Sequence, residues 1–341
     1  MRHLRSLGKE NLKNKVCLLR LDFNTEDNWR MEASLPTVKF LAAKCRAVVI
    51  LSHRGRPEGR EKQFSLEPQS RILSRLLKKE VIFVRHFDVL RIEKAVCNSL
   101  PGTVFLLENL RFLKEEEAND RSFARTLASL GDIYVNDAFA VSHRANASVA
   151  AITRFIDGYA GLEMEKEIAV LSQVMKNPKK PLVVIIGGLK ISGKLSVFHN
   201  LRRQASVFLV GGALDKKTLN LRVPKLIFPV DFKKENGDIK DIGPKSIVLF
   251  KEYIKDAATI ILNGPVGDIE KKEFENGTRE IAKSVVANKK AYKVVGGGET
   301  VMFLKKMKLD GKIDFISTGG GAMLEFLAGK KLPGIEALKK L

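Results

Sequence analysis

Residues 16–24 read VCLLRLDFN, an apolar run that ends in an aspartate and an asparagine. Such a run is typical of a buried parallel strand with polar groups at its carboxyl end. Similar runs recur through the first half, and the predicted strands are Val16–Leu21, Ala47–Leu51, Val81–Val84, Val104–Leu107 and Ile133–Val135. Helical spacing is found between them at Leu35–Cys45, Leu66–Leu77 and Arg121–Leu130, the last with Asp120 as N-cap. This alternation predicts an α/β fold with a doubly wound parallel sheet.

The second half repeats the rhythm, with predicted strands at Leu182–Ile186, Ser206–Val210, Leu226–Pro229, Thr259–Leu262, Ala291–Val295 and Ile313–Ser317. We therefore predict two doubly wound domains, residues 1–160 and 179–327. Between them, residues 161–178 are predicted to form an amphipathic helix, because four apolar residues share one face: Met164, Ile168, Leu171 and Met175. Asn177-Pro178 would end it. On sequence alone this helix is either a hinge or an ordinary packed helix.

The composition is that of a globular protein, with 341 residues and 45% hydrophobic content. This length suits two domains rather than one core. The apolar runs are too short to span a membrane, and Arg2, His3 and Arg5 lead into a polar stretch unlike a signal peptide. The three cysteines (Cys17, Cys45 and Cys97) show no metal-binding or paired spacing. We expect a cytoplasmic protein with no membrane partner.

The chain is strongly basic, with 60 Lys and Arg against 39 Asp and Glu, a formal net charge of +21. Such a charge favours anionic ligands: phosphorylated metabolites, nucleotides or nucleic acid. Arginine or histidine also follows several predicted strands, together with short polar side chains: Asp22, Asn24, Arg30, His53, Arg54, Arg56, Arg111, His143 and Arg144. Because carboxyl ends of parallel strands meet at one edge and arginine pairs with phosphate and carboxylate, the sequence predicts an anion site there.

Eight segments, in order, carry a specific resemblance to a known family. LRLDFN, SHRGRPEG, LLENLRF and YVNDAFAVSHR resemble the substrate-domain motifs of phosphoglycerate kinase. IIGGLKISGK, LNGPVGDIE, VVGGGET and ISTGGGAMLEFLAGKKLPG resemble its nucleotide-domain motifs. The resemblance implies a monomeric glycolytic kinase that transfers a phosphoryl group reversibly between ATP or ADP and 3-phosphoglycerate or 1,3-bisphosphoglycerate. It also implies that residues 328–341 return to the first, acid-binding domain, and that residues 179–327 bind the nucleotide.

The resemblance also assigns roles to particular residues. Those implied to bind 3-phosphoglycerate are Asp22, Asn24, Arg30, His53, Arg56, Arg111, His143 and Arg144. Those implied to bind the nucleotide are Gly188, Lys190, Lys194, Gly211, Gly212, Asn263, Pro265, Glu270, Gly297, Gly298, Glu299 and Thr300. Glu299 would meet the Mg²⁺ that accompanies ATP or ADP, and the groups implied to stabilise the transferred phosphoryl are Arg30, Lys190 and Gly320. We expect no general base, and closure about the helix at Glu163–Met175.

Several positions depart from the family pattern. Glu299 stands where the family usually has aspartate, which moves the carboxylate outward by a methylene. Gly193 replaces an aspartate between the two lysines, and Leu189 replaces a small residue. The loop after LDFN and the region between Gly212 and Gly243 are short, so that Ile239 and Lys240 occupy expected base-pocket positions. The remaining departures are Ala140, Val141 and Met323.

Three alternatives follow from these observations. Residues 188–194 nearly fit a P-loop, but Leu195 stands where Ser or Thr would hold magnesium. The chain could be a degenerate relative that binds a nucleotide or phosphorylated acid with little or no transfer. It could also be a nucleic-acid-binding protein, although its basic residues are dispersed and aromatic content is 7%. We expect no specific nucleic-acid partner, beyond weak association driven by charge.

Overall fold

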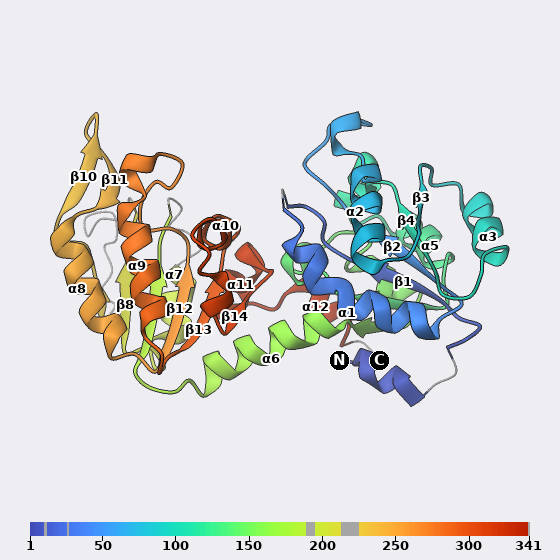
Figure 1. Ribbon diagram of the computed structural model, residues 1–341. Coiled ribbons are helices and arrows are strands. Elements are labelled where there is room, and N and C mark those ends of the chain that lie inside the picture. The colour runs from blue at the N-terminus through green and yellow to red at the C-terminus, as the bar shows by residue number, and fades with distance from the viewer. Residues whose placement is uncertain (10–11, 26, 189–194, 213–224, 340–341) are drawn as a thin grey trace. The chain divides into compact units, whose positions relative to one another are not determined.

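The computed structural model describes residues 1–9, 12–25, 27–188, 195–212 and 225–339. Contacts divide the chain into two compact units, each with its own parallel sheet (Figure 1). Unit 1 comprises Met1–Ile168 and Lys331–Leu341, and unit 2 comprises Ala169–Lys330. The predicted fold class is confirmed. The functions of the predicted domains stay predictions.

The strands of unit 1 are β1 (Val16–Arg20), β2 (Ala47–Leu51), β3 (Val81–Val84), β4 (Thr103–Leu107), β5 (Ile133–Asn136) and β6 (Gly158–Ala160). Within the described part of unit 1 they form a six-stranded sheet in the order β3-β4-β2-β1-β5-β6, with parallel pairings. All residues of β2 are buried, as expected of a strand inside a parallel sheet covered on both faces. Strands β1 to β5 lie where the sequence predicted them, and β6 adds an edge strand.

The helices of unit 1 are α1 (Trp29–Lys44), α2 (Glu67–Leu77), α3 (Val89–Cys97), α4 (Lys114–Glu117), α5 (Arg121–Ala128) and α12 (Pro333–Ala337). Helices α1 and α2 lie side by side (Figure 1). Helix α1 begins at Trp29 rather than at the predicted Leu35 and continues through Pro36. Asp120 caps α5 as predicted, since its Oδ1 accepts a hydrogen bond from the Phe123 amide at 2.7 Å.

The strands of the unit 2 sheet are β7 (Leu182–Ile186), β8 (Val207–Val210), β9 (Leu226–Ile227), β12 (Thr259–Asn263), β13 (Tyr292–Gly296) and β14 (Phe315–Ile316). Their order is β14-β13-β12-β7-β8-β9, again with parallel pairings. The antiparallel hairpin of β10 (Phe232–Glu235) and β11 (Asp238–Ile242) was not expected from the sequence. Asn236 and Gly237 form its turn, both with positive φ.

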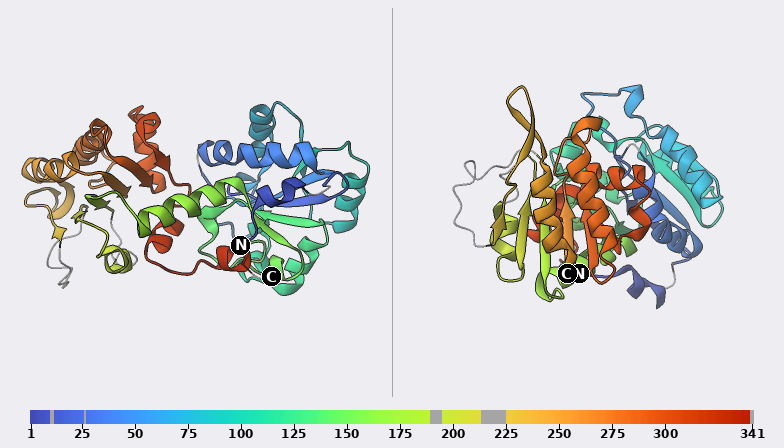
Figure 2. Two further views of the ribbon diagram at one scale, coloured as in Figure 1. Left: turned by 90° about the horizontal axis from the view of Figure 1, so that it is seen from below. Right: turned by 60° about the vertical axis from the view of Figure 1, so that its left-hand side comes forward.

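The helices of unit 2 are α7 (Leu195–Leu201), α8 (Pro244–Lys255), α9 (Asn276–Ala287), α10 (Gly298–Lys306) and α11 (Gly320–Leu327). Helices α8 and α9 lie side by side, as the views in Figures 1 and 2 agree. Helix α6 (Leu162–Lys176) matches the helix predicted between the domains, and the boundary between the two units falls within it.

Both sheets have a point where the strand order reverses. In unit 1 the chain passes from β1 to β2 on one side and later adds β5 on the other side of β1. In unit 2, β7 is likewise flanked by β8 and by β12. The carboxyl ends of strands at such a point border the crevice in which α/β proteins bind ligands. The topology therefore predicts that the residues following β1, β5, β7 and β12 lie at ligand-binding sites.

The end of the chain packs into unit 1. The Gly334 amide donates a hydrogen bond to the Ser142 carbonyl at 2.9 Å, and the side chains of Leu332, Ile335 and Leu338 are buried. Figures 1 and 2 show the N-terminal segment and this C-terminal segment in the same part of the unit. No helix in the described ranges has both the length and the apolar character needed to span a membrane.

Candidate active site

The predicted acid-binding residues come from the ends of neighbouring strands in unit 1. Asp22 and Asn24 follow β1, and Arg30 lies in the first turn of α1. The residues that follow the other strands are His53 and Arg56 after β2, Arg111 after β4, and His143 and Arg144 after β5. Since these strands are parallel and adjacent, their ends bring the residues to one edge of the sheet, here called the acid edge.

Asp22 organises the centre of the acid edge. Its Oδ2 accepts a hydrogen bond from Arg30 Nη1 at 3.0 Å, and its Oδ1 accepts one from the Asn24 amide at 2.8 Å. His53 Nε2 lies 3.8 Å from the same Oδ1. Burial acts to raise the pKa of Asp22, but the positive charge of groups around it outweighs burial, so that its pKa is lowered. Asp22 is therefore an ionised anchor for Arg30.

A second set of contacts connects the loops after β1, β2 and β4. Asn24 Oδ1 accepts a hydrogen bond from the Gly55 amide at 2.7 Å. Arg111 Nη1 donates to the Gly55 carbonyl at 2.6 Å, and Arg111 Nε lies 3.3 Å from Glu117 Oε1. These bonds hold Arg111 and the Gly55 backbone in fixed positions beside Asn24.

The acid edge carries an excess of positive charge. The pKa of Arg111 is lowered to about 10, first by burial and then by the positive charges of Arg144 and Arg20. Burial also lowers the pKa of His53 well below its ordinary value, and Arg20, Arg111 and Arg144 act in the same direction. Cations that depress one another's pKa in this way are stabilised by a bound anion.

The remaining predicted acid-site residues are less constrained. Arg56 is exposed, and no hydrogen bond or ion pair ties its side chain to another described residue. Arg144 is half-buried and acts on Arg111 and His53 through its charge. His143 is half-buried beside it. The structure thus brings Asp22, Asn24, Arg30, His53, Arg111 and Arg144 together, and leaves Arg56 at the rim.

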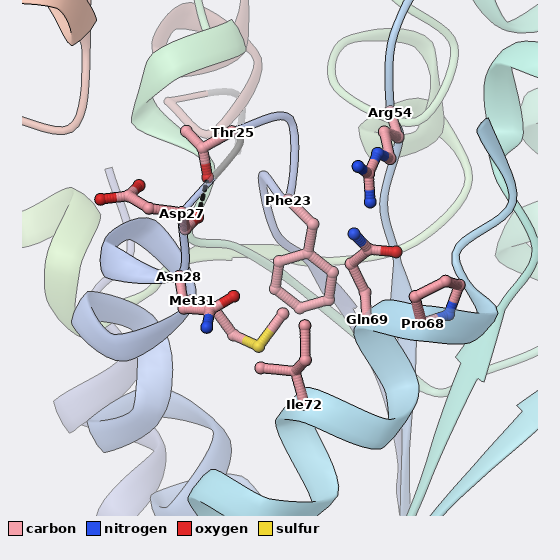
Figure 3. A pocket seen from close by; sticks show the side chains of 9 residues that line it. All are labelled: Phe23, Thr25, Asp27, Asn28, Met31, Arg54, Pro68, Gln69 and Ile72. Carbon is pink, nitrogen blue, oxygen red and sulfur yellow. Dashed lines mark hydrogen bonds between the residues drawn. The ribbon is translucent and has the colours of Figure 1, made fainter. Parts of the chain in front are cut away.

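A pocket of about 160 Å³ adjoins this edge (Figure 3). Its floor is apolar, formed by Phe23, Met31 and Ile72, while Arg54 and Gln69 approach it from the β2 loop and α2. Of the predicted acid-binding residues, none lines this pocket. The cationic cluster, rather than this pocket, is therefore the candidate anion site.

In unit 2 the backbones of neighbouring loops approach closely at the point where the strand order reverses. The Gly187 amide donates to the Asn263 carbonyl at 3.0 Å. A Cβ placed on Gly187 would lie 2.0 Å from the Pro265 carbonyl oxygen, so only glycine fits there. Gly188 and Gly212 have positive φ. These contacts bring the ends of β7, β8 and β12 close together with little side chain between them, as in sites where backbone meets phosphate.

The loops after β12, β13 and β14 also meet. Thr300 Oγ1 accepts a hydrogen bond from the Gly264 amide at 3.1 Å, and a Cβ on Gly320 would lie 3.9 Å from Gly297 Cα. Asn263 Nδ2 contacts Met323 Sδ at 3.7 Å. Met323, one of the departures from the family pattern, thus fills the space beside Asn263. We call this set of loop ends the glycine edge.

The other predicted nucleotide-binding residues differ in how firmly the structure holds them. The Gly211 amide donates to the Ile186 carbonyl at 2.9 Å, and the Gly212 amide donates to the Val266 carbonyl at 2.9 Å. Glu270 is exposed in the loop after β12, and its amide bonds to Asp268 Oδ1 at 3.1 Å. Lys190 and Lys194 lie outside the described residues, as do Leu189 and Gly193.

Glu299 is the predicted contact for Mg²⁺. It lies in the first turn of α10, is exposed, and forms no hydrogen bond or ion pair with the side chains that the structure describes. Within those residues, no group of three or more His, Cys, Asp or Glu could hold a metal. A single available carboxylate fits Mg²⁺ that is held mainly by nucleotide phosphates and water.

The structure adds one residue that the sequence did not single out. Arg20 lies at the end of β1 with 1% of its surface exposed, and its Nη2 is 3.2 Å from His53 Nδ1. The signal in the sequence was an arginine inside the otherwise apolar run of β1, because a buried charge must find partners.

The sequence and fold were compared with those of known proteins. The family model described as "Phosphoglycerate kinase" matches residues 7–222 and 215–330. A phosphoglycerate kinase of Dictyoglomus turgidum is 40% identical over 386 residues, covering 98% of this chain and 98% of the relative. One of Thermosipho africanus is 40% identical over 385 residues, covering 96% of each.

Solved structures give the same result. The crystal structure of phosphoglycerate kinase from Pyrococcus horikoshii OT3 matches with a TM-score of 0.87 at 29% identity, covering 99% of this chain and 98% of that chain. The structure of phosphoglycerate kinase from Coxiella burnetii matches with a TM-score of 0.79 at 34% identity, covering 97% and 98%.

Proposed function

The chain belongs to the phosphoglycerate kinase family, and we propose from its own residues how it carries out the family's reaction. It is a phosphotransferase whose acceptor is a carboxyl group, and it catalyses the reversible glycolytic transfer of a phosphoryl group between ATP and 3-phosphoglycerate. The observation that carries the proposed mechanism is the acid edge, where Arg111, Arg144 and Arg30 gather around Asp22 without an equal number of carboxylates.

The acid substrate would bind at the acid edge. Asn24, His53 and Arg56 supply donors from the loops after β1 and β2, while Arg111, His143 and Arg144 supply donors and charge from the loops after β4 and β5. Asp22 holds Arg30 by an ion pair at 3.0 Å, which orients its guanidinium before substrate arrives. Arginine forks match both the phosphate and the carboxylate of 3-phosphoglycerate.

The nucleotide would bind at the glycine edge. Gly188, Gly297 and Gly298 leave room for phosphate oxygens near main-chain amides. Gly211 and Gly212, whose amides donate to the Ile186 and Val266 carbonyls, would let the ligand pass close to their backbone. In addition, Asn263, Pro265 and Thr300 would line the nucleotide, with Lys190 and Lys194 on its phosphates and Glu270 on the ribose hydroxyls. The close approach of Gly187 to the Pro265 carbonyl supports this assignment, because it holds the loops after β7 and β12 together beside the proposed site.

Enzymes of this family use ATP or ADP with Mg²⁺. When bound, Mg²⁺ neutralises charge on the phosphate oxygens. We propose that Glu299 is its protein contact here, since the carboxylate is exposed and available beside the glycine edge. The longer side chain, compared with aspartate, would place its oxygens further from the Gly297 backbone.

Phosphoryl transfer needs positioning and charge stabilisation rather than covalent chemistry. Arg30, Lys190 and the backbone of Gly320 would neutralise the oxygens of the phosphoryl group as it moves. The acceptor is a carboxylate that is already ionised at neutral pH, so no general base is required. Transfer requires the two ligands to meet in line and away from water, and we propose that motion about α6 achieves this.

We further propose that the enzyme works as a cytoplasmic monomer without a specific nucleic-acid partner. Its basic residues are dispersed along the chain, which supports at most weak association driven by charge. Light scattering should give a mass near 38.0 kDa. DNA binding that is tight at physiological salt, with a steep dependence on salt concentration, would contradict this proposal.

The test of function is Mg-ATP-dependent phosphorylation of 3-phosphoglycerate by the purified protein, with GTP as a second donor. Lys190→Ala should lose activity by roughly two orders of magnitude, because it removes the positive charge proposed to stabilise the transferred phosphoryl group. Lys312→Ala, an exposed lysine of the same unit, is the matched control and should retain full activity.

The comparisons give no support to a degenerate relative that binds without transfer. The same assay checks this alternative directly. Absence of turnover, while 3-phosphoglycerate still raises the melting temperature, would revive it and would locate the loss in the nucleotide site. Equal rates with ATP and GTP would show that the enzyme, with its shortened region between Gly212 and Gly243, does not discriminate between adenine and guanine.

A further inference from the structure

Behind His53 lies a chain of buried polar side chains that the proposed mechanism does not use. Arg20, Glu116 and Ser148 have exposed fractions of 1%, 1% and 0%. They come from β1, α4 and the segment after β5, so they are distant in sequence. Groups this deeply buried are costly unless each finds a partner, which makes their arrangement informative.

Ser148 connects the two charged members. Its Oγ accepts a hydrogen bond from Arg20 Nε at 2.8 Å and donates one to Glu116 Oε1 at 2.6 Å. The Ser148 amide donates to Glu116 Oε2 at 2.9 Å, and Glu116 Oε1 lies 3.8 Å from Arg20 Nη2. Tyr134 Oη donates to the Ser148 carbonyl at 2.6 Å and fixes the segment. Both oxygens of Glu116 are thereby bonded, and its charge balances that of Arg20.

Arg20 is also bonded to the acid edge. Nη1 donates to the Leu21 carbonyl, and Nη2 lies 3.2 Å from His53 Nδ1. A guanidinium has only donors, so the bond requires a lone pair on His53 Nδ1. The proton of the neutral ring must then be on Nε2, and a doubly protonated ring would place N–H against N–H.

The Nε2–H group points to the acid edge. It lies 3.8 Å from Asp22 Oδ1, which is beyond hydrogen-bond distance, and it has no hydrogen-bond partner among the residues described. The His53 side chain is 1% exposed. A buried donor without a partner is unfavourable in the free protein and is satisfied by an incoming acceptor oxygen.

We propose that Arg20 is a positioning residue which, held by Ser148 and Glu116, fixes His53 as the neutral Nε2–H tautomer that donates to the acid substrate. The proposal rests on the proposed acid site, of which His53 is a part. It assigns His53 the role of an oriented neutral donor, while the arginines of the acid edge supply the charge.

The surroundings of His53 favour this neutral state. Burial and the positive charges of Arg20, Arg111 and Arg144 lower its pKa, whereas Asp22 raises it. Arg30, which faces Asp22, adds a further positive charge to the same edge. His53 should therefore stay neutral across the physiological range of pH, and substrate affinity should not depend on its protonation.

Nitrogen-15 NMR of histidine-labelled protein tests the tautomer in the absence of substrate. The resonance pair that disappears in His53→Gln identifies His53 among the five histidines. We expect an unprotonated Nδ1 and a protonated Nε2 from pH 6 to pH 8. A proton on Nδ1, or titration of the ring within this range, would overturn the proposal.

Variants test the positioning chain. Arg20→Lys keeps the charge but loses the fork, and Ser148→Ala removes the link to Glu116. Each should let the Nδ1–H tautomer appear and raise KM for 3-phosphoglycerate by ~10-fold, with KM for Mg-ATP within about twofold of the wild type. Glu116→Gln is the milder third variant if the others fold poorly. Glu115→Gln, one residue earlier and exposed, is the matched control and should change neither readout.

The outcomes separate this proposal from the proposed function. Addition of 3-phosphoglycerate should shift the His53 Nε2 resonance. If the tautomer is as expected but 3-phosphoglycerate leaves that resonance unchanged, the acid site is misplaced and the proposal for substrate donation fails with it. If 3-phosphoglycerate shifts the resonance but the variants raise both KM values equally, Arg20 is structural only and the positioning role is wrong.

Discussion

Asp22 lies among positively charged side chains at the acid edge, and it shows how one residue can organise a site. It pairs with Arg30 at 3.0 Å and leaves His53 Nε2 at 3.8 Å. Asp22 thus pairs with Arg30 alone, while Glu116 balances Arg20 and Glu117 lies beside Arg111. Arg144 forms no ion pair with a carboxylate among the described residues, so positive charge remains available to an anion. The strength of the site depends on this imbalance rather than on any single arginine.

Removal of Arg30 tests its role in transfer. Arg30→Ala should lower kcat by roughly two orders of magnitude, because a charge that stabilises the moving phosphoryl group is lost. Steady-state kinetics with 3-phosphoglycerate and Mg-ATP measure the change. Arg71→Ala, which removes an exposed arginine of α2, should behave as the wild type. Turnover near the wild-type value in Arg30→Ala would refute the assigned role.

Two buried carboxyls, Glu163 at the start of α6 and Asp137 after β5, make stability depend on pH. Burial raises the pKa of Glu163 to about 7 and that of Asp137 to about 6, and Asp137 also accepts a hydrogen bond from the Met164 amide at 2.9 Å. In the unfolded chain both groups lose their protons near pH 4. The folded state therefore holds extra protons between about pH 4 and pH 7, and the stability they contribute is lost as pH rises through this range.

Glu163→Gln should remove much of this dependence. Between pH 5 and pH 8 the wild type should lose roughly 2 kcal/mol of unfolding free energy more than the variant does. Urea unfolding followed by fluorescence of Trp29, the only tryptophan, reports on unit 1. Glu80→Gln, at an exposed position, is the control. An unchanged difference between the two pH values in Glu163→Gln would show that Glu163 is not the titrating group.

At the scale of elements, both edges depend on short loops that follow strands directly. The loop after β1 reaches Asn24, whose side chain binds the Gly55 amide of the β2 loop at 2.7 Å. In unit 2, the β12 and β13 loops are joined by the bond between the Gly264 amide and Thr300 Oγ1 at 3.1 Å. Bonds between neighbouring loops fix the backbone that faces the ligands and reduce the ordering cost of binding.

The N-cap of α5 is predicted to contribute to the stability of unit 1. Asp120→Ala should destabilise unit 1 by about 1 kcal/mol, because the Phe123 amide loses the acceptor at 2.7 Å. Asp120→Asn keeps a capping oxygen and should cost far less. Urea unfolding followed by Trp29 fluorescence gives both values, and equal losses in the two variants would show that charge, rather than the cap, matters here.

For the whole molecule, the notable feature is that unit 1 is built from both ends of the sequence. Residues from Lys331 onward belong to it, whereas Ala169–Lys330 form unit 2. Unit 2 is thus inserted between the parts of unit 1. Burial of Leu332, Ile335 and Leu338 makes the C-terminal segment a component of the unit 1 core.

Truncation after Lys330 should therefore destabilise unit 1 selectively. Loss of three buried aliphatic side chains removes at least ~4 kcal/mol of apolar burial. The Trp29 fluorescence transition should shift to lower urea, while the transition of unit 2, followed by circular dichroism, stays in place. Truncation after Leu338 keeps the buried side chains and serves as control. A Trp29 transition at the wild-type urea concentration would contradict this account.

Much of the fold could be predicted because parallel strands leave a local pattern. Ala47–Leu51 is a continuous apolar run since it is buried on both faces, and Asp120 precedes its helix as caps do. Other elements were less well predicted, among them the short edge strand β6. Helix α1 begins six residues before the predicted Leu35, because Trp29 and Met31 are buried and the helix extends back past Pro36 to include them. The hairpin of β10 and β11 was missed although Asn236-Gly237 is a typical turn pair.

The charged groups of the acid edge could be proposed from the residues that follow each strand, and their roles from family motifs. The protonation states and tautomers of these groups could not be predicted, because they depend on groups that are distant in sequence. His53 is 33 residues from Arg20, and Arg20 is 128 residues from Ser148. Local patterns report which residues are buried or turn the chain. Which buried donor meets which acceptor depends on the packing of β1, β2 and α4, so only the folded chain reveals that Arg20 orients His53.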